Sequence, residues 1–323
     1  MNPYSDNIVS LPRSLKLPRL SIFSLDWAAG VVLAKCALAV RDRSQTHLVA
    51  GAACDEDPEK ARVRATSELF ERFAYLQLRR MADRRETVSV KSVDSGITHK
   101  MPVARLLGDR DDKADAHGAE PLFQDSSGFA LSADRDLARR SAHQDAPERL
   151  LQRLLLAGEV GRHRRSCASV PETLGDLNLS SWIIADTSFG SCAMVEARDR
   201  STGFRACGTA FRPSFESAAR HALTESVQAI DVQRLHDPTV AAPSPRALRR
   251  LLHGSFNFPE LTRPRPSFVS WKGLLEYFGL TSVEAQMELH TSECDFFVPR
   301  VQLFGQRVLI RRLDAAFRTG AFG

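Results

Sequence analysis

The stretch Pro58–Arg80 of the sequence reads PEKARVRATSELFERFAYLQLRR. Its small and apolar residues recur at steps of three and four positions, which is the period of one face of an α-helix. Asp57 before Pro58 is typical of a helix start, and Glu59 falls in the first turn. The spacing therefore predicts one amphipathic helix. The residues of its apolar stripe are Ala61, Ala65, Leu69, Phe73 and Leu76.

The polar face of this predicted helix carries an acidic pattern. Glu68, Glu71 and Arg72 stand at i, i+3 and i+4, so two carboxylates and a guanidinium lie on adjacent turns of one face. A single pattern of this kind is usually a solvated surface with one ion pair, because charged residues are mostly exposed. A functional interpretation needs the pattern to recur elsewhere in the chain.

The pattern does recur. Asp145, Glu148 and Arg149 repeat the spacing in HQDAPERLLQRLLL, and Glu225 and Gln228 stand at i and i+3 in PSFESAARHALTESVQ. Each of the three helical stretches follows a segment with glycine and small residues: HLVAGAAC, QDSSGFAL and FRACGTAF. A unit of strand, small-residue turn and acidic helix therefore occurs about three times, which is a weak internal repeat rather than a solenoid period.

These three segments resemble motifs of the YcaO superfamily, whose members use ATP to activate peptide backbone amides. GAACDEDPEKARVRATSELFER is similar to the first ATP/Mg segment of the family. DSSGFALSADRDLARRSAHQDAPER resembles the second, and GTAFRPSFESAARHALTESVQ resembles the third. The three motifs occur in the family's order and together span Gly51–Gln228, so the resemblance covers the middle of the chain.

The spacing and the resemblance together imply ATP and Mg²⁺ as cofactors. Carboxylate oxygens are the ligands that Mg²⁺ prefers, and the guanidinium fork suits phosphate. The residues expected at ATP are Glu68, Arg72, Ser127, Arg149, Glu225 and Gln228. The residues expected at the metal are Glu68, Glu71, Asp145, Glu148 and Glu225. If these carboxylates converge, they repel one another without cations. The resemblance assigns no catalytic residue.

The chain departs from the family's pattern at several positions. Arg64 stands where the family often has a serine, and Ser127 stands where an asparagine usually occurs. Asp145 replaces a longer glutamate, and Pro147 interrupts the predicted second helix. Ala133 and Leu137 stand at positions that often bear asparagine and glutamate. These departures bear on ATP hydrolysis more than on the fold.

The resemblance implies three alternative functions. The first is an azoline-forming cyclodehydratase that matures a ribosomally made peptide of a bacteriocin or toxin pathway. The second is a thioamide-forming enzyme, and the third is a non-catalytic scaffold that binds a precursor peptide or a partner enzyme. The implied partners are the precursor peptide, an E1-like leader-binding protein and a flavin dehydrogenase. A homodimer or a multi-enzyme complex is also consistent with the family.

The order of the predicted elements indicates an α+β fold. Strands and long helices occur without regular βαβ alternation, and neither a G-x-G-x-x-G nor a P-loop motif is present. The resemblance implies mixed and antiparallel sheets packed with long helices around a central nucleotide cleft. The expected organisation is an N-terminal arm (1–18) and a single domain (19–323), with a motif-bearing core (47–235) and C-terminal strands and short helices (246–315).

Several local predictions accompany this fold. Within the polar stretch 96–120, the segment 108–120 is expected to be a surface loop, and 161–180 is expected to be another loop. At Pro147 the helix is expected either to kink or to restart with Asp145 as its N-cap. A third acidic helix is expected over 215–234. The predicted strands include 31–40, 47–53 and a meander of 182–185, 193–197 and 204–208.

Composition narrows the class of protein. The formal net charge of +5 over 323 residues is mild, and no basic–aromatic recognition pattern occurs, so nucleic acid is not an expected partner. The six cysteines are scattered without a C-x-x-C pair, which argues against zinc. No apolar run is long enough for a signal peptide or a membrane span. The expected location is the cytoplasm.

Overall fold

The structure is a computed structural model with α-helices and mainly antiparallel sheets, so the predicted α+β class is confirmed. It describes residues 8–10, 19–42, 45–93, 95–107, 120–121, 128–132, 134–156, 159–235, 270–278, 280–290 and 300–310. Ser127 and Ala133 lie outside the described residues, as does 246–269 at the start of the predicted C-terminal region. Within the predicted irregular arm, Ile8–Ser10 form a short strand, β1, so that prediction is wrong there.

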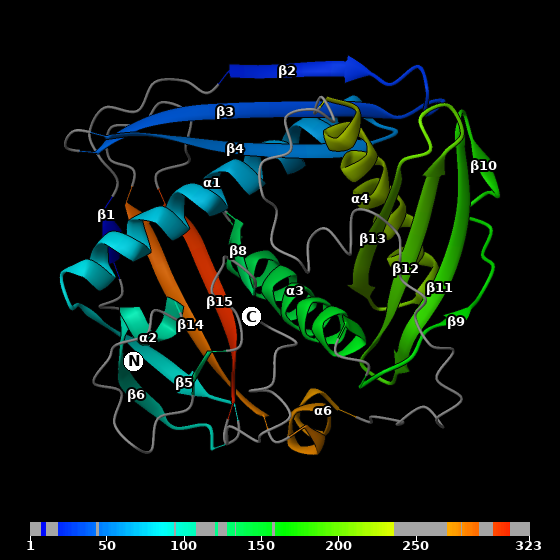
Figure 1. The fold of residues 1–323 in the computed structure, drawn as a ribbon. Coiled ribbons are helices and arrows are strands. Elements are labelled where there is room, and N and C mark those ends of the chain that lie inside the picture. The colour runs from blue at the N-terminus through cyan, green and yellow to red at the C-terminus, as the bar shows by residue number, and fades with distance from the viewer. Residues whose placement is uncertain are drawn as a thin grey trace.

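A three-stranded antiparallel sheet and one long helix form the first large unit (Figure 1). The helix is α1 (Pro58–Asp83), which packs across the second and third strands. The Asp57 carboxylate caps α1 by accepting a hydrogen bond from the amide of Glu59, which confirms the predicted helix start. In order across the sheet, the strands are β2 (Arg19–Ser24), β3 (Val32–Asp42) and β4 (Gln45–Asp55).

A five-stranded sheet and a second long helix form the next unit. The helix, α4 (Phe215–Leu235), packs on this sheet and also reaches β4 of the first unit. The predicted meander is confirmed, but its first strand begins at Leu177, inside the stretch 161–180 that was predicted as a loop. The strands are β9 (His163–Arg164), β10 (Thr173–Leu174), β11 (Leu177–Thr187), β12 (Gly190–Asp199) and β13 (Arg205–Arg212).

The two units are repeats of one another at a constant separation. Arg64 and His221 stand 157 positions apart, and the same separation joins the last residues of β4 and β13 and the first residues of α1 and α4. No gap interrupts this alignment from β4 to the middle of α4. The residue pairs that are identical across it are Gly51/Gly208, Ala53/Ala210, Glu59/Glu216, Ala61/Ala218, Ala65/Ala222 and Glu68/Glu225.

The shared glycine lets each helix approach its sheet closely. A Cβ at Gly51 would collide with the carbonyl oxygen of Ala65 and lie 2.6 Å from the amide nitrogen of Leu69. A Cβ at Gly208 would meet the carbonyl of Ala222 in the same way and lie 2.6 Å from the amide nitrogen of Ser226. Only glycine fits here, because the helix backbone itself fills the space where a side chain would stand.

A seven-stranded sheet forms the third layer. The stretch before the predicted loop contributes β6 and the short helix α2 (Val103–Leu107), whose Val103, Leu106 and Leu107 are buried. The surface loop predicted for 108–120 lies outside the described residues except for Glu120. The short helix α6 (Trp271–Tyr277) packs near β14. The strands are β6 (Thr98–Pro102), β5 (Thr87–Ser92), β14 (Leu280–His290), β15 (Arg300–Ile310) and β7 (Glu120–Pro121), with β1 beside β14 and β8 (Phe129–Ser132) beside β15.

The helix α3 (Arg135–Leu156) bridges the layers, since it packs on β15 and β8 of the seven-stranded sheet and on β13 of the five-stranded sheet. It continues through Pro147, so the alternative of a new helix with Asp145 as its N-cap is wrong. Proline lacks only its own amide donor, and the neighbouring residues Ala146 and Glu148 are buried against the rest of the molecule. This packing outweighs the one missing helical hydrogen bond.

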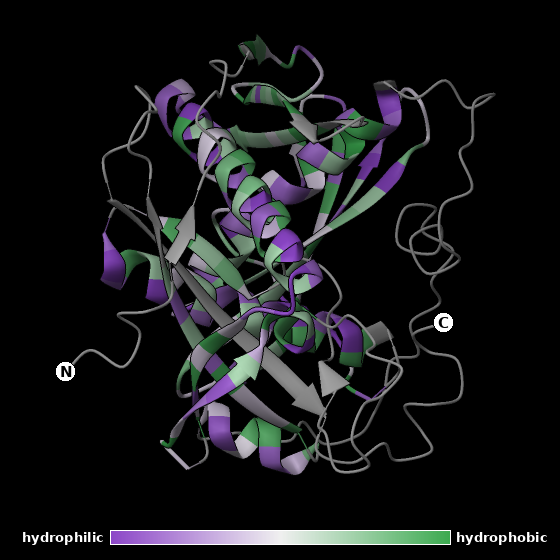
Figure 2. Cartoon of the chain, turned by 90° about the vertical axis from the view of Figure 1, so that its left-hand side faces the viewer, coloured by the Kyte–Doolittle hydropathy of each residue, from purple (hydrophilic) through white to green (hydrophobic). Residues whose placement is uncertain are grey.

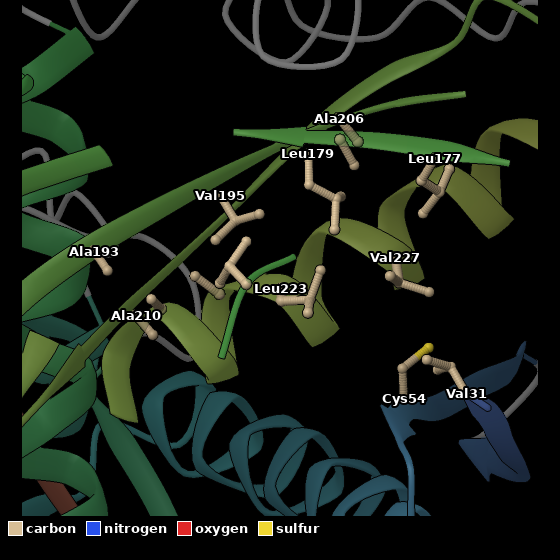
Figure 3. Close-up of a cluster of buried hydrophobic side chains, with 14 of the residues drawn as sticks. Val31, Cys54, Leu177, Leu179, Ala193, Val195, Ala206, Ala210, Leu223 and Val227 are labelled. Carbon is tan, nitrogen blue, oxygen red and sulfur yellow. The ribbon is translucent and has the colours of Figure 1, made fainter. Parts of the chain in front are cut away.

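The largest core cluster joins the two repeated units. Leu223 and Val227 on α4 point between the strands of the meander and the segment around Val31 and Cys54 (Figure 3). The helix is therefore buried from two sides by apolar side chains. Burial of this kind is the main stabilising term in a domain of this size.

Hydrophilic and hydrophobic residues alternate along the helices (Figure 2). This alternation is what amphipathic packing against a sheet requires. In the described part of the chain, no helix combines the length and the hydrophobicity that a membrane crossing would need.

Candidate functional site

The predicted acidic residues come from three helices that lie together in the middle of the molecule (Figure 1). Their charges interact across the helices. Asp145 of α3 contributes to raising the pKa of Glu71 on α1, and Glu225 of α4 does the same for Glu68 and Glu148, in each case after burial as the main cause. The structure therefore brings all five predicted acidic side chains into one electrostatic cluster.

Glu68 is held between α1 and the neighbouring strand. One of its carboxylate oxygens accepts a hydrogen bond from the amide of Ala52 at 2.8 Å, and the other pairs with Arg72. Arg72 also donates to the carbonyl of Ala50 at 2.7 Å. Burial raises the pKa of Glu68, and the charge of Arg72 partly offsets this. Glu68 and Arg72 thus fix α1 to β4 as well as face the cluster.

Glu71 stands out because nothing neutralises it directly. Among the described residues, no hydrogen bond or ion pair engages its carboxylate. Burial raises its pKa well above the ordinary value, and the charges of Asp145 and Glu68 raise it further, against Arg72 and Arg149. A partly buried carboxylate that no neighbouring cation pairs with favours taking up a proton or a cation. Glu71 is therefore the side chain of the cluster best suited to bind a cation.

Glu148 is the most deeply buried carboxylate of the cluster, with 6% of the residue exposed. It accepts hydrogen bonds from the hydroxyl of Thr209 and the amide of Phe211, both at 3.3 Å, and lies 3.9 Å from Arg212. Burial raises its pKa to about 7, against the opposing charge of Arg149. Glu148 therefore links α3 to β13, and the opposite charge of Arg212 lies beside its carboxylate.

Asp145 joins α3 to Gly128, which lies near the start of the second predicted motif. Its carboxylate accepts a hydrogen bond from the amide of Gly128 and lies 3.4 Å from Arg149. Arg149 also lies within 3.5 Å of the side-chain oxygen of Gln152. Ser127, predicted to contact ATP, precedes Gly128 directly but lies outside the described residues.

Glu225 meets a cation that the sequence did not assign to the site. The guanidinium of Arg64, on α1, lies 3.3 Å from the Glu225 carboxylate, and His221 lies 3.7 Å from the same oxygen. Burial and the charges of Arg212, Arg64 and Arg149 lower the pKa of His221 to about 2, so its ring is neutral near pH 7. Arg64 is therefore the charged partner of Glu225.

Gln228 lies one turn beyond Glu225 on α4 and is half-buried. At the repeat separation of 157 positions it corresponds to Glu71 of α1. The second unit thus offers a neutral amide where the first offers an unpaired carboxylate.

Three residues of the site were not predicted as such: Arg64, Arg212 and His221. Arg64 and His221 stand four positions before Glu68 and Glu225, so an i, i+4 search upstream of each glutamate would have found them. Nothing in the spacing indicates Arg212, because it is the last residue of a strand and meets Glu148 only through the packing of α3 on β13.

The cluster fits a cation on its α1–α3 side. Among the described residues, no three His, Cys, Asp or Glu side chains form a group that could hold a metal by themselves. Mg²⁺ does not need one, since it commonly uses one or two carboxylates together with substrate phosphates and water. Glu71 on α1 and Asp145 on α3, whose charge helps to raise the pKa of Glu71, supply two carboxylates of this kind. On the α4 side, Arg64 already engages Glu225.

Comparison with known proteins identifies the fold. No known family profile and no curated protein sequence matches this sequence. Solved structures do match. An E. coli microcin synthetase complex (McbBCD) is 11% identical with a TM-score of 0.57, and the match covers 91% of this chain and 87% of the other. YcaO from Methanopyrus kandleri, bound with AMPPCP and Mg²⁺, is 13% identical with a TM-score of 0.55, over 91% of this chain and 84% of the other.

The chain has the YcaO fold. A heterocyclase in complex with substrate and cofactor matches equally well, with a TM-score of 0.57 and 12% identity over 87% of this chain. The match spans only 48% of that heterocyclase chain, so the present chain covers about half its length. The predicted YcaO-like architecture is confirmed by these matches, and identities this low carry the likeness no further than the fold.

Proposed function

We propose that this YcaO-fold chain activates backbone amides of a ribosomally made peptide at the expense of ATP, as an azoline-forming cyclodehydratase. The observation that supports the proposal is the convergence of acidic side chains from α1, α3 and α4, with arginines among them, in one partly buried cluster. A solved protein of the same fold is bound with AMPPCP and Mg²⁺. A cluster of buried carboxylates is costly for stability, and a phosphate–cation ligand relieves that cost.

In this proposal Glu71 and Asp145 hold one Mg²⁺. When bound, Mg²⁺ would neutralise phosphate charge and so ease phosphoryl transfer. Arg149 pairs with Asp145 and Arg72 pairs with Glu68, and both guanidinium groups would then contact phosphate oxygens. Gln228 and Ser127 would hydrogen-bond the nucleotide.

The reaction that follows from the proposal has two parts. A Cys, Ser or Thr side chain of the peptide attacks the preceding backbone carbonyl, and the oxygen of the resulting adduct takes the γ-phosphoryl group of ATP. Loss of phosphate then leaves the azoline ring. With external sulfide as the nucleophile, the same steps give a thioamide. The protein contributes position and charge compensation, which dominate phosphoryl transfer generally.

The proposed partners are the precursor peptide, a leader-binding E1-like protein and a flavin dehydrogenase. Microcin synthetase, which shares the fold, is a complex, and a second structure of it has pro-MccB17 bound. By analogy the peptide would reach the cluster with the help of a partner protein. A sulfur-delivery partner in place of the dehydrogenase would indicate thioamide formation.

The decisive experiment measures phosphate release from ATP with a candidate precursor peptide. We expect Glu71→Gln to lower the rate about 100-fold or more, the size of effect seen when one electrostatic stabiliser is removed. Glu59→Gln, the same change on the exposed first turn of α1, is the matched control and should keep the wild-type rate. Full turnover by both Glu71→Gln and Glu148→Gln would show that the cluster is not the active site.

A second candidate is the non-catalytic scaffold, which one observation favours. Glu68, Asp145, Glu148 and Glu225 each have an arginine within 4 Å, so most of the cluster is already neutralised without a ligand. Titration with Mg·ATP up to millimolar concentration separates the candidates. Binding supports the enzyme, whereas its absence in a folded protein supports the scaffold.

A further inference from the structure

Arg64 connects the two repeated units inside the cluster. It stands on α1, but its guanidinium reaches Thr224 and Glu225 on α4 at 3.5 and 3.3 Å. On its own side it lies 3.0 Å from the carbonyl oxygen of Cys54 and 3.4 Å from the carboxylate of Asp55. Its side chain is 29% exposed, so the charge is held within the site rather than on the surface.

The groups around Arg64 are those that a hard divalent cation selects. Two carboxylates, one backbone carbonyl and one hydroxyl surround the guanidinium, and all four contacts are through oxygen. Mg²⁺ and Ca²⁺ prefer such oxygen ligands. The His221 ring approaches the same guanidinium at 3.4 Å. One positive charge therefore occupies an oxygen-lined position between α1 and α4.

We propose that Arg64 is a permanent internal cation that takes the place of a divalent metal ion at Glu225. The site would then bind a metal ion only on its α1–α3 side, at Glu71 and Asp145. On its α4 side, the guanidinium of Arg64 would contact the phosphate instead. The inference rests on the proposed nucleotide site for its ligand, a polyphosphate group. The occupancy of the position by Arg64 can be tested without nucleotide.

The test counts Mn²⁺ bound to the purified full chain by electron paramagnetic resonance, with and without a non-hydrolysable ATP analogue. Arg64→Ser should bind one more Mn²⁺ per chain than wild type, or the same number with at least about tenfold higher affinity, because a positive charge near the ion is removed. Adding Glu225→Gln to Arg64→Ser should abolish this gain. Arg64→Lys, which keeps the charge, should behave as wild type.

The matched control is Arg62→Ser, since Arg62 lies on the same helix but pairs with exposed Glu59. It should leave Mn²⁺ binding unchanged. The inference is overturned if folded Arg64→Ser binds Mn²⁺ exactly as weakly as wild type under both conditions. If Arg64→Ser does not fold, Glu225→Gln in the wild-type background decides: unchanged Mn²⁺ binding supports the inference, and reduced binding overturns it.

Failure of the inference is separate from failure of the proposed function. Phosphate release by the wild-type chain tests the function, whereas the Mn²⁺ count tests which group fills the position at Glu225. A chain that gains a metal in Arg64→Ser but never releases phosphate would contradict the function and support the inference.

Discussion

The unit of β2, β3, β4 and α1 and the unit of β11, β12, β13 and α4 have the same construction but different charges. Their packing positions agree: Gly51 and Gly208 hold the helices close, and alanines recur along the buried faces. The residues that the two units contribute to the acidic cluster and its surroundings differ. Asp55, Arg64 and Glu71 of the first unit correspond to Arg212, His221 and Gln228 of the second, while Glu68 and Glu225 are shared.

This difference shows how one scaffold can make an asymmetric site. The first unit supplies the unpaired carboxylate of Glu71 and the cation of Arg64, whereas the second supplies Arg212 and the neutral residues His221 and Gln228. A ligand between the units would therefore meet different charges from the two sides. The packing that aligns the helices is common to both units, so the charges can differ without moving the backbone.

The largest expected effect concerns an ion pair found in the second unit. Asp199 has a fully buried side chain and pairs with Arg234 at 2.6 Å, which also lies over the ring of Trp27. We expect Asp199→Asn to lower the free energy of unfolding by about 3–5 kcal/mol, because it leaves a partly buried arginine without its partner. Denaturant unfolding measures this. The control is Asp176→Asn, since Asp176 is half-exposed and 3.8 Å from Arg234, and should lose less than about 1 kcal/mol.

The two glycines test whether the units are equivalent in packing. Gly51→Ala and Gly208→Ala should each lower the free energy of unfolding by up to about 3 kcal/mol, because the added methyl group meets helix backbone that cannot rotate away. Gly203→Ala is a useful contrast, since a Cβ there meets nothing but strains a positive φ of 75°. Equal losses at Gly51 and Gly208 would sharpen the comparison, and a loss at only one of them would break it.

The second unit should also be acid-sensitive. Burial alone would raise the pKa of Asp199, but hydrogen bonds from Thr202, Ser201 and Arg234 lower it to about 2 from 3.8. Because the pKa of Asp199 is lower in the folded chain than in the unfolded chain, its ionised carboxylate stabilises the fold at pH values above the unfolded pKa. This stabilisation is lost as the pH falls from about 3.8 towards 2. We expect about 2 kcal/mol to disappear over this window. The pH dependence of unfolding should flatten in Asp199→Asn, and an unchanged slope would contradict the assignment.

The smallest effect is expected from the surface contact between the units. Arg220 on α4 and Glu56 before α1 lie 3.1 Å apart, with 61% and 67% of their side chains exposed. Arg220→Gln should change the free energy of unfolding by less than about 0.5 kcal/mol, because solvent and salt screen the pair. Lys35 and Asp231 join the same units at 2.6 Å with much less exposure, so Lys35→Gln should cost more. The reverse order would show that exposure does not rank these contacts.

The parts of this fold that follow from sequence are those with local causes. The helical period of α1, the cap at Asp57 and the turns of the meander are determined by residues that are close in sequence. The helix α2 was not predicted because the average of the surrounding stretch is polar, although Val103, Leu106 and Leu107 are enough to anchor it. The proline rule overestimated the effect of Pro147, because tertiary packing on both sides holds α3.

The site itself could be predicted only as a set of acidic positions. Spacing along one helix indicates which side chains share a face, and it placed Glu68, Glu71 and Arg72 correctly on α1. It gives no information on which helices meet. The pairing of Arg64 with Glu225, 161 positions later, depends on how α1 and α4 cross. Charge compensation between helices is therefore a property of the folded chain.

The glycine contacts have one further consequence for the helices that carry the acidic cluster. Backbone touches backbone where α1 meets β4 and where α4 meets β13, so no side-chain rotamer can adjust those two distances. Each of these two helices is therefore held at a fixed distance from its own sheet. The helix α3 contacts its neighbours through side chains such as Ala138, Ala142 and Leu150 rather than through its backbone. Packing of this kind allows small shifts of the helix. A shift of α3 against these two units would move Asp145 and Glu148 with it.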